Sequence, residues 1–273
     1  MALENTAKRV LVSIAAIPLI LIVSYLGSFF FFSFVLAIAL ISYYEFTNLA
    51  KYKGANTNLW IGFTALILIL INQFNNIFET YSFLLFLMIV LSLIELFRNK
   101  NSAIINIGTT LFGIFYIGLF ASSLIGIREF YPAIGDLYTR GGYIIISIFI
   151  SIWICDSAAF FGGTSLGKHK LFPRVSPNKS WEGAIFGFIF AIISMILLKF
   201  LILEFLSWNS IIAFGVIVGT VGQIGDLVES LIKRDAGVKD SSHLIPGHGG
   251  IFDRFDSILF AAPVILLYLK YIL

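Results

Sequence analysis

Three carboxylates in the C-terminal half of the chain have the residue type and the setting to hold a metal ion. Asp226 follows a run of glycines, and Asp253 and Asp256 follow a second glycine-rich stretch. Carboxylate oxygens are hard ligands of the kind that Mg²⁺ binds. Cationic side chains that can donate to phosphate oxygens accompany these acids, namely Lys233, Arg234, Lys239 and Arg254. The combination predicts chemistry on phosphates.

The second glycine-rich stretch surrounds a histidine, His248. Glycines at Gly247, Gly249 and Gly250 let the backbone approach a ligand closely or form an anion-binding nest. We therefore predict that His248 contacts the substrate. A structural reading of the acids that follow also stays open, because carboxylates at a helix N-terminus are stabilised by the helix dipole.

A further group of polar residues lies upstream. A proline-bearing turn brings Ser176, Lys179 and Ser180 to the start of a predicted helix, where backbone N–H groups favour phosphate. A capped loop with Trp181 as an anchor at the membrane interface would explain the same residues, and the sequence favours neither reading. Asp156, near the end of an apolar run, is an additional candidate metal ligand.

The elements that must position these residues are membrane helices. The chain has 273 residues, of which 59% are hydrophobic and 12% charged, whereas a soluble domain has about 25% charged residues. The apolar residues form runs of about 17–23 residues, which is the length that spans a bilayer. The net charge of +3 is typical of a membrane protein with basic cytoplasmic loops, so we expect no nucleic-acid partner.

We predict an all-α polytopic membrane fold with about nine transmembrane helices. The spans are expected at 10–26, 29–49, 58–73, 80–97, 103–127, 142–161, 184–206, 210–229 and 256–272. The first five belong to an N-terminal transmembrane region, residues 1–140. The last four, with the polar loops 162–183 and 230–255, form a C-terminal catalytic region, residues 141–273.

The eighth predicted span carries small residues on one face. Gly215, Gly219 and Gly222 have helical spacing, which lets helices pack closely in lipid. Asp226 and Lys233 continue the same face, so the carboxylate is expected to point into protein. An ionisable group at membrane depth is costly and indicates function, although a simple pairing of Asp226 with Lys233 remains an alternative.

The basic residues predict the orientation of the chain. A cytoplasmic N-terminus and an outer C-terminus place most of the 18 Lys and Arg residues on the cytoplasmic side. Both long polar loops then face the cytoplasm, where nucleotides are found. Glu45 and Glu95 lie near cytoplasmic helix ends and are expected to reach solvent at the interface. The stretch from Arg128 to Arg140 is expected to be a solvated outer loop.

The C-terminal motif resembles the signature of a known family. The residues that carry it are Ser230, Lys233, Arg234, Lys239, Asp240, Ile245–Gly250 and Asp253–Asp256. In type and spacing they are similar to the signature of phosphatidate cytidylyltransferases, also called CDP-diglyceride synthases. Asp156–Ser157 and the Ser176–Gly183 segment also look like this family. Residues 1–150 resemble it only in their repeated apolar spans.

The resemblance implies a reaction and roles for individual residues. CTP and phosphatidate would give CDP-diacylglycerol and pyrophosphate, with Mg²⁺ as cofactor and a second cation allowed. Asp226 and Asp253 would be metal ligands, and Lys233 and Asp256 would form a charge pair beside them. The enzyme would be a homodimer in the cytoplasmic membrane, with its active site facing the cytoplasm.

Two other classes of protein remain as alternatives. A CTP-dependent lipid kinase, or another CDP-lipid enzyme, would bind the same metal and nucleotide, and only the resemblance singles out cytidylyl transfer. A transporter could also carry an intramembrane carboxylate. Transporters often have inverted repeats and sites at the midplane, whereas this chain shows no repeat and its acids lie at cytoplasmic helix ends. A structural scaffold would leave the charged clusters unexplained.

Overall fold

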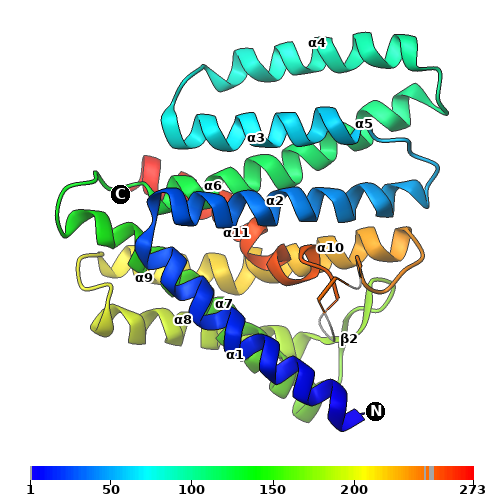
Figure 1. Ribbon diagram of the computed structural model, residues 1–273. Coiled ribbons are helices and arrows are strands. Elements are labelled where there is room, and N and C mark those ends of the chain that lie inside the picture. Colours follow the sequence, from blue (N-terminus) through cyan, green and yellow to red (C-terminus); the bar gives the residue numbers. More distant parts are fainter. Residues whose placement is uncertain (1, 243, 246–248) are drawn as a thin grey trace. The chain divides into compact units, whose positions relative to one another are not determined.

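The protein is almost entirely helical (Figure 1). The computed structural model describes residues 2–242, 244–245 and 249–273, with side chains from residue 12 onward. The elements are α1 (Ala2–Leu26), α2 (Ser28–Lys51), α3 (Leu59–Asn75), α4 (Thr80–Arg98), α5 (Ala103–Gly113), η1 (Ile114–Leu119), α6 (Phe120–Arg128), α7 (Leu137–Leu166), β1 (Lys170–Phe172), β2 (Ser176–Ser180), α8 (Trp181–Leu201), α9 (Trp208–Ile217), η2 (Val218–Gly222), α10 (Gln223–Asp235) and α11 (Phe252–Tyr271).

Helix occupies each of the stretches predicted as membrane spans, which confirms the all-α fold. Within the described residues, six helical stretches are long and apolar enough to cross a membrane. They are Ser28–Lys51, Thr80–Arg98, Ala103–Arg128, Leu137–Leu166, Trp181–Leu201 and Trp208–Asp235. Two shorter apolar helices are Val12–Leu26 and Leu59–Asn75. The protein is therefore a multi-pass membrane protein.

The two polar connections contain more regular structure than the sequence predicted. α7 continues to Leu166, α10 continues to Asp235, and α11 begins at Phe252. The first connection also contains an antiparallel hairpin, in which β1 pairs with β2. The sequence does not predict these strands, because β1 has only three residues and β2 is polar and lacks the apolar alternation that marks a strand.

The chain forms two compact units. The first comprises Met1–Ala16, Ser28–Gly126 and Ile232–Arg254, and the second comprises Ile17–Gly27, Ile127–Leu231 and Phe255–Leu273. Asp253 and Lys233 belong to the first unit, whereas Asp226 and Asp256 belong to the second.

In the first unit, α2, α3 and the π-helical segment η1 pack around aromatic side chains (Figure 1). Tyr43 of α2 is fully buried, and a methyl group at Gly62 would lie 2.1 Å from its ring. Gly113 is crowded in the same way by Phe46 and Tyr43. The small residues therefore allow these helices to approach closely around large rings.

Glu95 in α4 does not reach solvent, so the prediction made for it is wrong. Its side chain is 6% exposed. It accepts a hydrogen bond from the amide of Asn106 at 2.6 Å and pairs with Arg98 at 3.2 Å. Arg98 also donates to the carbonyl of Asn56. Buried charges are stable when they are paired and hydrogen-bonded, and this group ties α4 to α5 and to the loop before α3.

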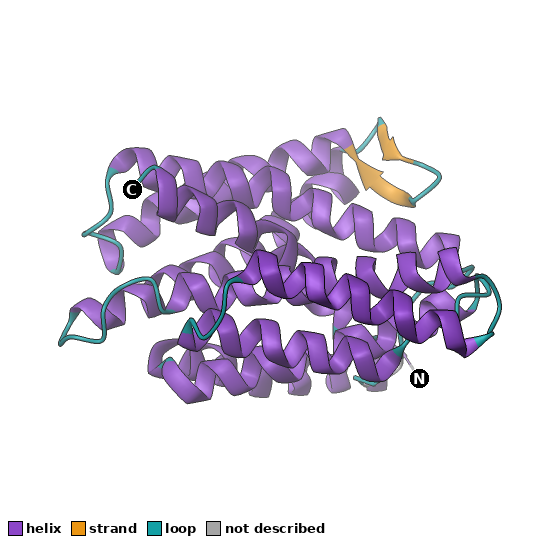
Figure 2. Ribbon diagram, turned by 90° about the horizontal axis from the view of Figure 1, so that it is seen from above, coloured by secondary structure: helices purple, strands orange, loops and turns teal. Residues whose placement is uncertain are grey.

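In the second unit, α7 and α8 form a closely packed helical hairpin, with the β-hairpin at its connecting end (Figure 2). A methyl group at Gly183 would lie 2.6 Å from the carbonyl oxygen of Ala159, and one at Gly187 would lie 3.0 Å from that of Cys155. Because the two backbones nearly touch, they fix the position of the hairpin and of the polar residues that it carries.

The glycine stripe of the eighth predicted span changes direction partway along the helix. Gly215 and Gly219 face α8, but Gly222 and Gly225 face α11. The cause is the π-helical segment η2, which places more residues in each turn and rotates the positions that follow. The predicted single face is therefore wrong beyond Gly219. Asp226 follows this change of direction, in the first turn of α10.

Arg128 is fully buried, so the predicted solvated outer loop does not begin there. Its guanidinium donates to the carbonyl oxygens of Ser24 at 2.7 Å, Tyr25 at 2.8 Å and Tyr138 at 3.2 Å. Ser24 and Tyr25 lie in the last turn of α1, where backbone carbonyls lack helical partners. Arg128 therefore caps α1.

Replacing Arg128 with leucine is expected to destabilise the protein by about 3 kcal/mol or more, because buried carbonyls would lose their donors. Thermal unfolding in detergent micelles measures the effect. Arg140→Leu is the matched control. Its guanidinium stacks 5.1 Å from the ring of Phe205, an interaction worth about 1 kcal/mol. Equal shifts of the two midpoints would contradict the capping role.

Candidate active site

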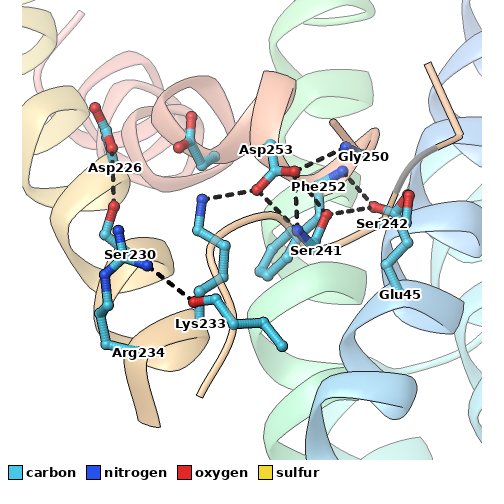
Figure 3. Close-up of polar contacts among 12 residues, drawn as sticks. Glu45, Asp226, Ser230, Lys233, Arg234, Ser241, Ser242, Gly250, Phe252 and Asp253 are labelled. Atoms are coloured by element: carbon cyan, nitrogen blue, oxygen red, sulfur yellow. Dashed lines mark hydrogen bonds and ion pairs between the residues drawn. The ribbon is translucent and has the colours of Figure 1, made fainter. Parts of the chain in front are cut away.

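Asp253 is the centre of a dense hydrogen-bond network in the first unit (Figure 3). Its carboxylate lies 2.7 Å from the ammonium of Lys233. It also accepts from the backbone N–H of Gly250 at 2.7 Å and from the N–H and hydroxyl of Ser241, both at 3.0 Å. The side chain of Asp253 is 2% exposed. Several fixed donors and a cation therefore hold this carboxylate in one orientation.

Glu45 of α2 belongs to the same network, although it was not among the predicted site residues. It was expected to reach solvent at the membrane interface, which is wrong, because it is 2% exposed. It accepts from the hydroxyls of Ser242 at 2.5 Å and Ser241 at 3.1 Å. The backbone N–H groups of Ile251 and Phe252 donate to it at 3.1 and 2.7 Å. Glu45 therefore binds the chain on both sides of the glycine-rich stretch.

Two glycines in this stretch are required by the carboxylates beside them. Gly249 has a φ of +80°, a conformation that L side chains rarely adopt, and a methyl group there would lie 2.7 Å from Asp253. At Gly250, a methyl group would lie 2.0 Å from the hydroxyl of Ser241 and 2.6 Å from both oxygens of Glu45. Within the described residues, these two glycines approach the carboxylates of Asp253 and Glu45 and the hydroxyl of Ser241. The approach of this stretch to a ligand stays a prediction.

Asp226 in the second unit pairs with Lys179 of β2 at 2.5 Å. The two side chains are 33% and 31% exposed, respectively. Asp226 also accepts from the hydroxyl of Ser230, one turn further along α10, at 3.4 Å (Figure 3). The structure therefore brings together two residues that the sequence had assigned to separate constellations, and it gives Asp226 a lysine partner from the hairpin.

Two further carboxylates lie near Asp226. Asp256 of α11 is 8% exposed and accepts from the N–H of Ser257 at 2.6 Å. It lies close enough to Asp226 and to Asp156 of α7 for their charges to repel one another, and close enough to Lys179 to be attracted to it. Three acids with one nearby lysine leave acidic groups in excess in this part of the second unit, and a bound cation would offset their mutual repulsion.

The residues at the end of the hairpin have two structural roles: Ser180 caps α8, and Glu182 holds the base of the hairpin together. The hydroxyl of Ser180 accepts from the N–H of Gly183 at 3.2 Å, so Ser180 is the N-cap of α8. This bears out the capped-loop reading for Ser180. Glu182 binds the N–H of Lys168 at 3.1 Å and the ring of His169 at 2.6 Å, which closes the base of the hairpin.

The remaining predicted site residues that the structure describes are half-buried or exposed. Ser176 is half-buried in β2, and its Cα pairs with that of Phe172. Arg234, Lys239 and Arg254 are exposed, and Arg234 donates to the carbonyl of Val238 at 2.9 Å. His248 lies outside the described residues.

The carboxylates have the chemistry of a magnesium site, although they form no closed cage. Among the described residues, no group of three or more His, Cys, Asp or Glu side chains is arranged to hold a metal. Mg²⁺ usually binds through one or two carboxylates, with waters and substrate phosphates completing its shell. Asp226 and Asp253 each lie within 3 Å of a lysine ammonium. Both positions therefore stabilise positive charge and fit such an ion.

Comparisons with known proteins agree with this chemistry. A sequence profile of the cytidylyltransferase family matches residues 7–272. Phosphatidate cytidylyltransferases of Staphylococcus haemolyticus and Staphylococcus aureus are each 34% identical to the chain over 262 residues, covering 94% of it and 96% of the relative. That of Staphylococcus epidermidis is 32% identical over the same lengths. The match extends across all the membrane helices and both polar networks, and the chain belongs to the cytidylyltransferase family.

Proposed function

We propose that the chain transfers the CMP moiety of CTP to phosphatidate, giving CDP-diacylglycerol and pyrophosphate in a magnesium-dependent reaction. The observation that carries this proposal is the match of 34% identity over 94% of the chain to enzymes named phosphatidate cytidylyltransferase. The signature residues Lys233 and Asp253, which form a buried ion pair, support it independently.

The reaction needs positioning and charge neutralisation more than proton transfer. A phosphate oxygen of phosphatidate, already ionised at neutral pH, forms a bond to the α-phosphorus of CTP. The bond between that phosphorus and the oxygen bridging to the β-phosphorus breaks, and pyrophosphate leaves with the electron pair. Catalysis then rests on holding two anions in line and offsetting their repulsion.

The acidic residues would hold the metal. Asp226 and Asp253 are proposed as ligands of Mg²⁺, with Asp156 as an additional candidate and a second cation allowed. When bound, the ion would offset negative charge on the triphosphate. Asp256 would orient Lys233 and keep it charged, as the family resemblance implies. In the structure the ammonium of Lys233 pairs with Asp253.

The basic residues and the hairpin would hold the phosphates. Arg234, Lys239 and Arg254 are exposed and would donate to phosphate oxygens, as would His248. One of the two substrate anions would bind near the start of α8, where Lys179, Ser176 and Ser180 would contact its phosphate oxygens. The diacyl tails of phosphatidate would stay in the bilayer, beside the apolar outer surface of the helices.

The membrane arrangement follows from the basic residues and from the bacterial relatives. We propose nine spans with a cytoplasmic N-terminus and an outer C-terminus, in the cytoplasmic membrane and as a homodimer. The active site then faces the cytoplasm, where CTP is found. The positive-inside pattern of Lys and Arg supports this orientation.

The alternatives predict different products. A CTP-dependent lipid kinase would leave the cytidine in water, and a transporter would make no lipid product. The test uses purified protein in detergent with CTP labelled in its cytidine ring, phosphatidate and Mg²⁺. We expect labelled CDP-diacylglycerol in the organic phase and none with EDTA. Label that stays in the aqueous phase while phosphatidate is consumed would overturn the proposal.

Lys179→Met is expected to lower kcat/KM for CTP by about 10²-fold, the value of one charge-assisted hydrogen bond to a phosphate. Thermal stability should change little, because the Lys179–Asp226 pair is about one-third exposed. Steady-state kinetics and thermal unfolding measure the two effects. Lys170→Met, an exposed lysine of the same hairpin, is the control and should keep wild-type kinetics. Equal kinetics in both variants would exclude Lys179 from substrate binding.

A further inference from the structure

We propose that Glu45 is a positioning residue for the reaction: it fixes the base of the glycine-rich stretch so that Asp253 keeps the orientation needed to bind a cation. This inference rests on the proposed function for its kinetic consequences, and on the first unit alone for its geometry. Glu45 lies 196 residues from Ser241 in the sequence, in a helix that carries none of the family signature.

The contacts of Glu45 fall at the two ends of one segment. Ser241 and Ser242 precede the glycine-rich stretch, and Ile251 and Phe252 follow it. One carboxylate oxygen binds Ser242 and Ile251, and the other binds Ser241 and Phe252. Each oxygen thus joins the beginning of the segment to its end. The two ends are fastened together by a single side chain.

The same residues position Asp253. Ser241 donates its N–H and its hydroxyl to Asp253, and Gly250 donates its N–H. The hydroxyl of Ser241 has one hydrogen, yet it lies 3.1 Å from Glu45 and 3.0 Å from Asp253. Glu45 has three other donors, so it remains satisfied when that hydrogen points to Asp253. Ser241 therefore links the two carboxylates.

An ionised carboxylate is the group that this position requires. Each oxygen of Glu45 accepts from one backbone N–H and one hydroxyl. In Glu45→Gln, one of these oxygens becomes an NH₂ group, and in either orientation it points at a backbone N–H of Ile251 or Phe252. A buried donor facing a donor is unfavourable, so the base of the segment should open and Asp253 should lose its fixed orientation.

The experiment compares Glu45→Gln with Glu95→Gln. Both replace a buried carboxylate of the first unit, 2% and 6% exposed respectively, but Glu95 contacts Asn106 and Arg98, outside the signature. We expect Glu45→Gln to lower kcat about 10²-fold and to raise the Mg²⁺ concentration for half-maximal activity about 10-fold, with KM for phosphatidate unchanged. Glu95→Gln should keep wild-type Mg²⁺ dependence.

Hydrogen exchange provides a readout that is independent of activity. In detergent and without substrates, the peptide covering residues 249–253 should exchange at least about 10-fold faster in Glu45→Gln than in wild type, because its N–H groups lose their acceptor. The same peptide in Glu95→Gln should exchange at the wild-type rate. Unchanged exchange and unchanged Mg²⁺ dependence in Glu45→Gln would overturn the inference, as would equal changes in Glu95→Gln.

Ser242→Ala tests the inference if Glu45→Gln fails to fold. It removes one hydroxyl donor to Glu45, at 2.5 Å, and leaves the carboxylate in place. We expect a smaller change in the same direction, about 5-fold in both kcat and Mg²⁺ dependence, and wild-type values would contradict the role. If wild-type protein forms no CDP-diacylglycerol, the proposed function fails, and the exchange measurement still decides whether Glu45 fastens the segment.

Discussion

Asp253→Asn is expected to lower CMP transfer by at least about 10³-fold, because a group that stabilises charge in the transition state is lost. The substitution preserves shape, but the amide carries one NH₂ group. One carboxylate oxygen of Asp253 binds the ammonium of Lys233, and the other binds the N–H of Gly250. In either orientation the new NH₂ therefore points at a donor. The negative charge that would bind Mg²⁺ is also gone.

The control for this variant is Asp235→Asn. Asp235 belongs to the same unit and pairs with Lys53 at 3.0 Å, but its side chain is 64% exposed. An exposed pair of this kind contributes about 1 kcal/mol or less to stability, so activity should stay within about twofold of wild type. Measurable transfer by Asp253→Asn at a rate similar to that of Asp235→Asn would remove Asp253 from the site.

Gly250→Ala is expected to have the second largest effect. The added methyl group would lie 2.0 Å from the hydroxyl of Ser241 and 2.6 Å from both oxygens of Glu45. These neighbours cannot move away cheaply, because Glu45 is held by three donors besides Ser241, and Ser241 also binds Asp253. Overpacking of this kind costs about 1–3 kcal/mol, and the displaced carboxylates should lower kcat about 10²-fold or more.

Gly108→Ala separates this crowding from a general effect of losing a glycine. Gly108 lies in α5 of the same unit, and a methyl group there would have no atom within 4 Å. It should leave kcat unchanged and stabilise the helix slightly, since alanine has the higher helix propensity. Thermal unfolding and steady-state kinetics measure both variants. A Gly250→Ala protein with wild-type kcat would show that the stretch tolerates movement and that the carboxylate network does not set the rate.

The positions of the helices could be predicted from the sequence, because the bilayer imposes a length and a composition on each span. The candidate acids could also be predicted, since Asp226 and Asp253 stand out in an otherwise apolar chain. The residues that hold them could not. Glu45 and Arg128 looked like interfacial or solvated residues because each lies near a helix end. Each has partners more than a hundred residues away, and no local pattern records such a contact.

Local geometry was harder to predict than burial. The glycines of the eighth span indicated a single packing face, but the π-helical segment η2 divides it, and Gly225 joins the second half. The pairing of Lys179 with Asp226 depends on the β-hairpin, whose strands are too short and too polar to be recognised. A carboxylate inside an apolar run was the one signal that could have identified Glu45, because such a group is costly unless it has partners.

A change of metal preference tests most directly whether Asp226 and Asp253 bind the cation. Cysteine thiolate is a soft ligand that binds Cd²⁺ well and Mg²⁺ poorly. The only native cysteine, Cys155, is buried, so the new thiol is the one added at the position under test. Asp226→Cys and Asp253→Cys should be inactive with Mg²⁺ and regain at least about 10-fold activity with Cd²⁺, while wild type and Asp235→Cys prefer Mg²⁺. Full activity of either site variant with Mg²⁺, or no recovery with Cd²⁺ in both, would contradict the assignment.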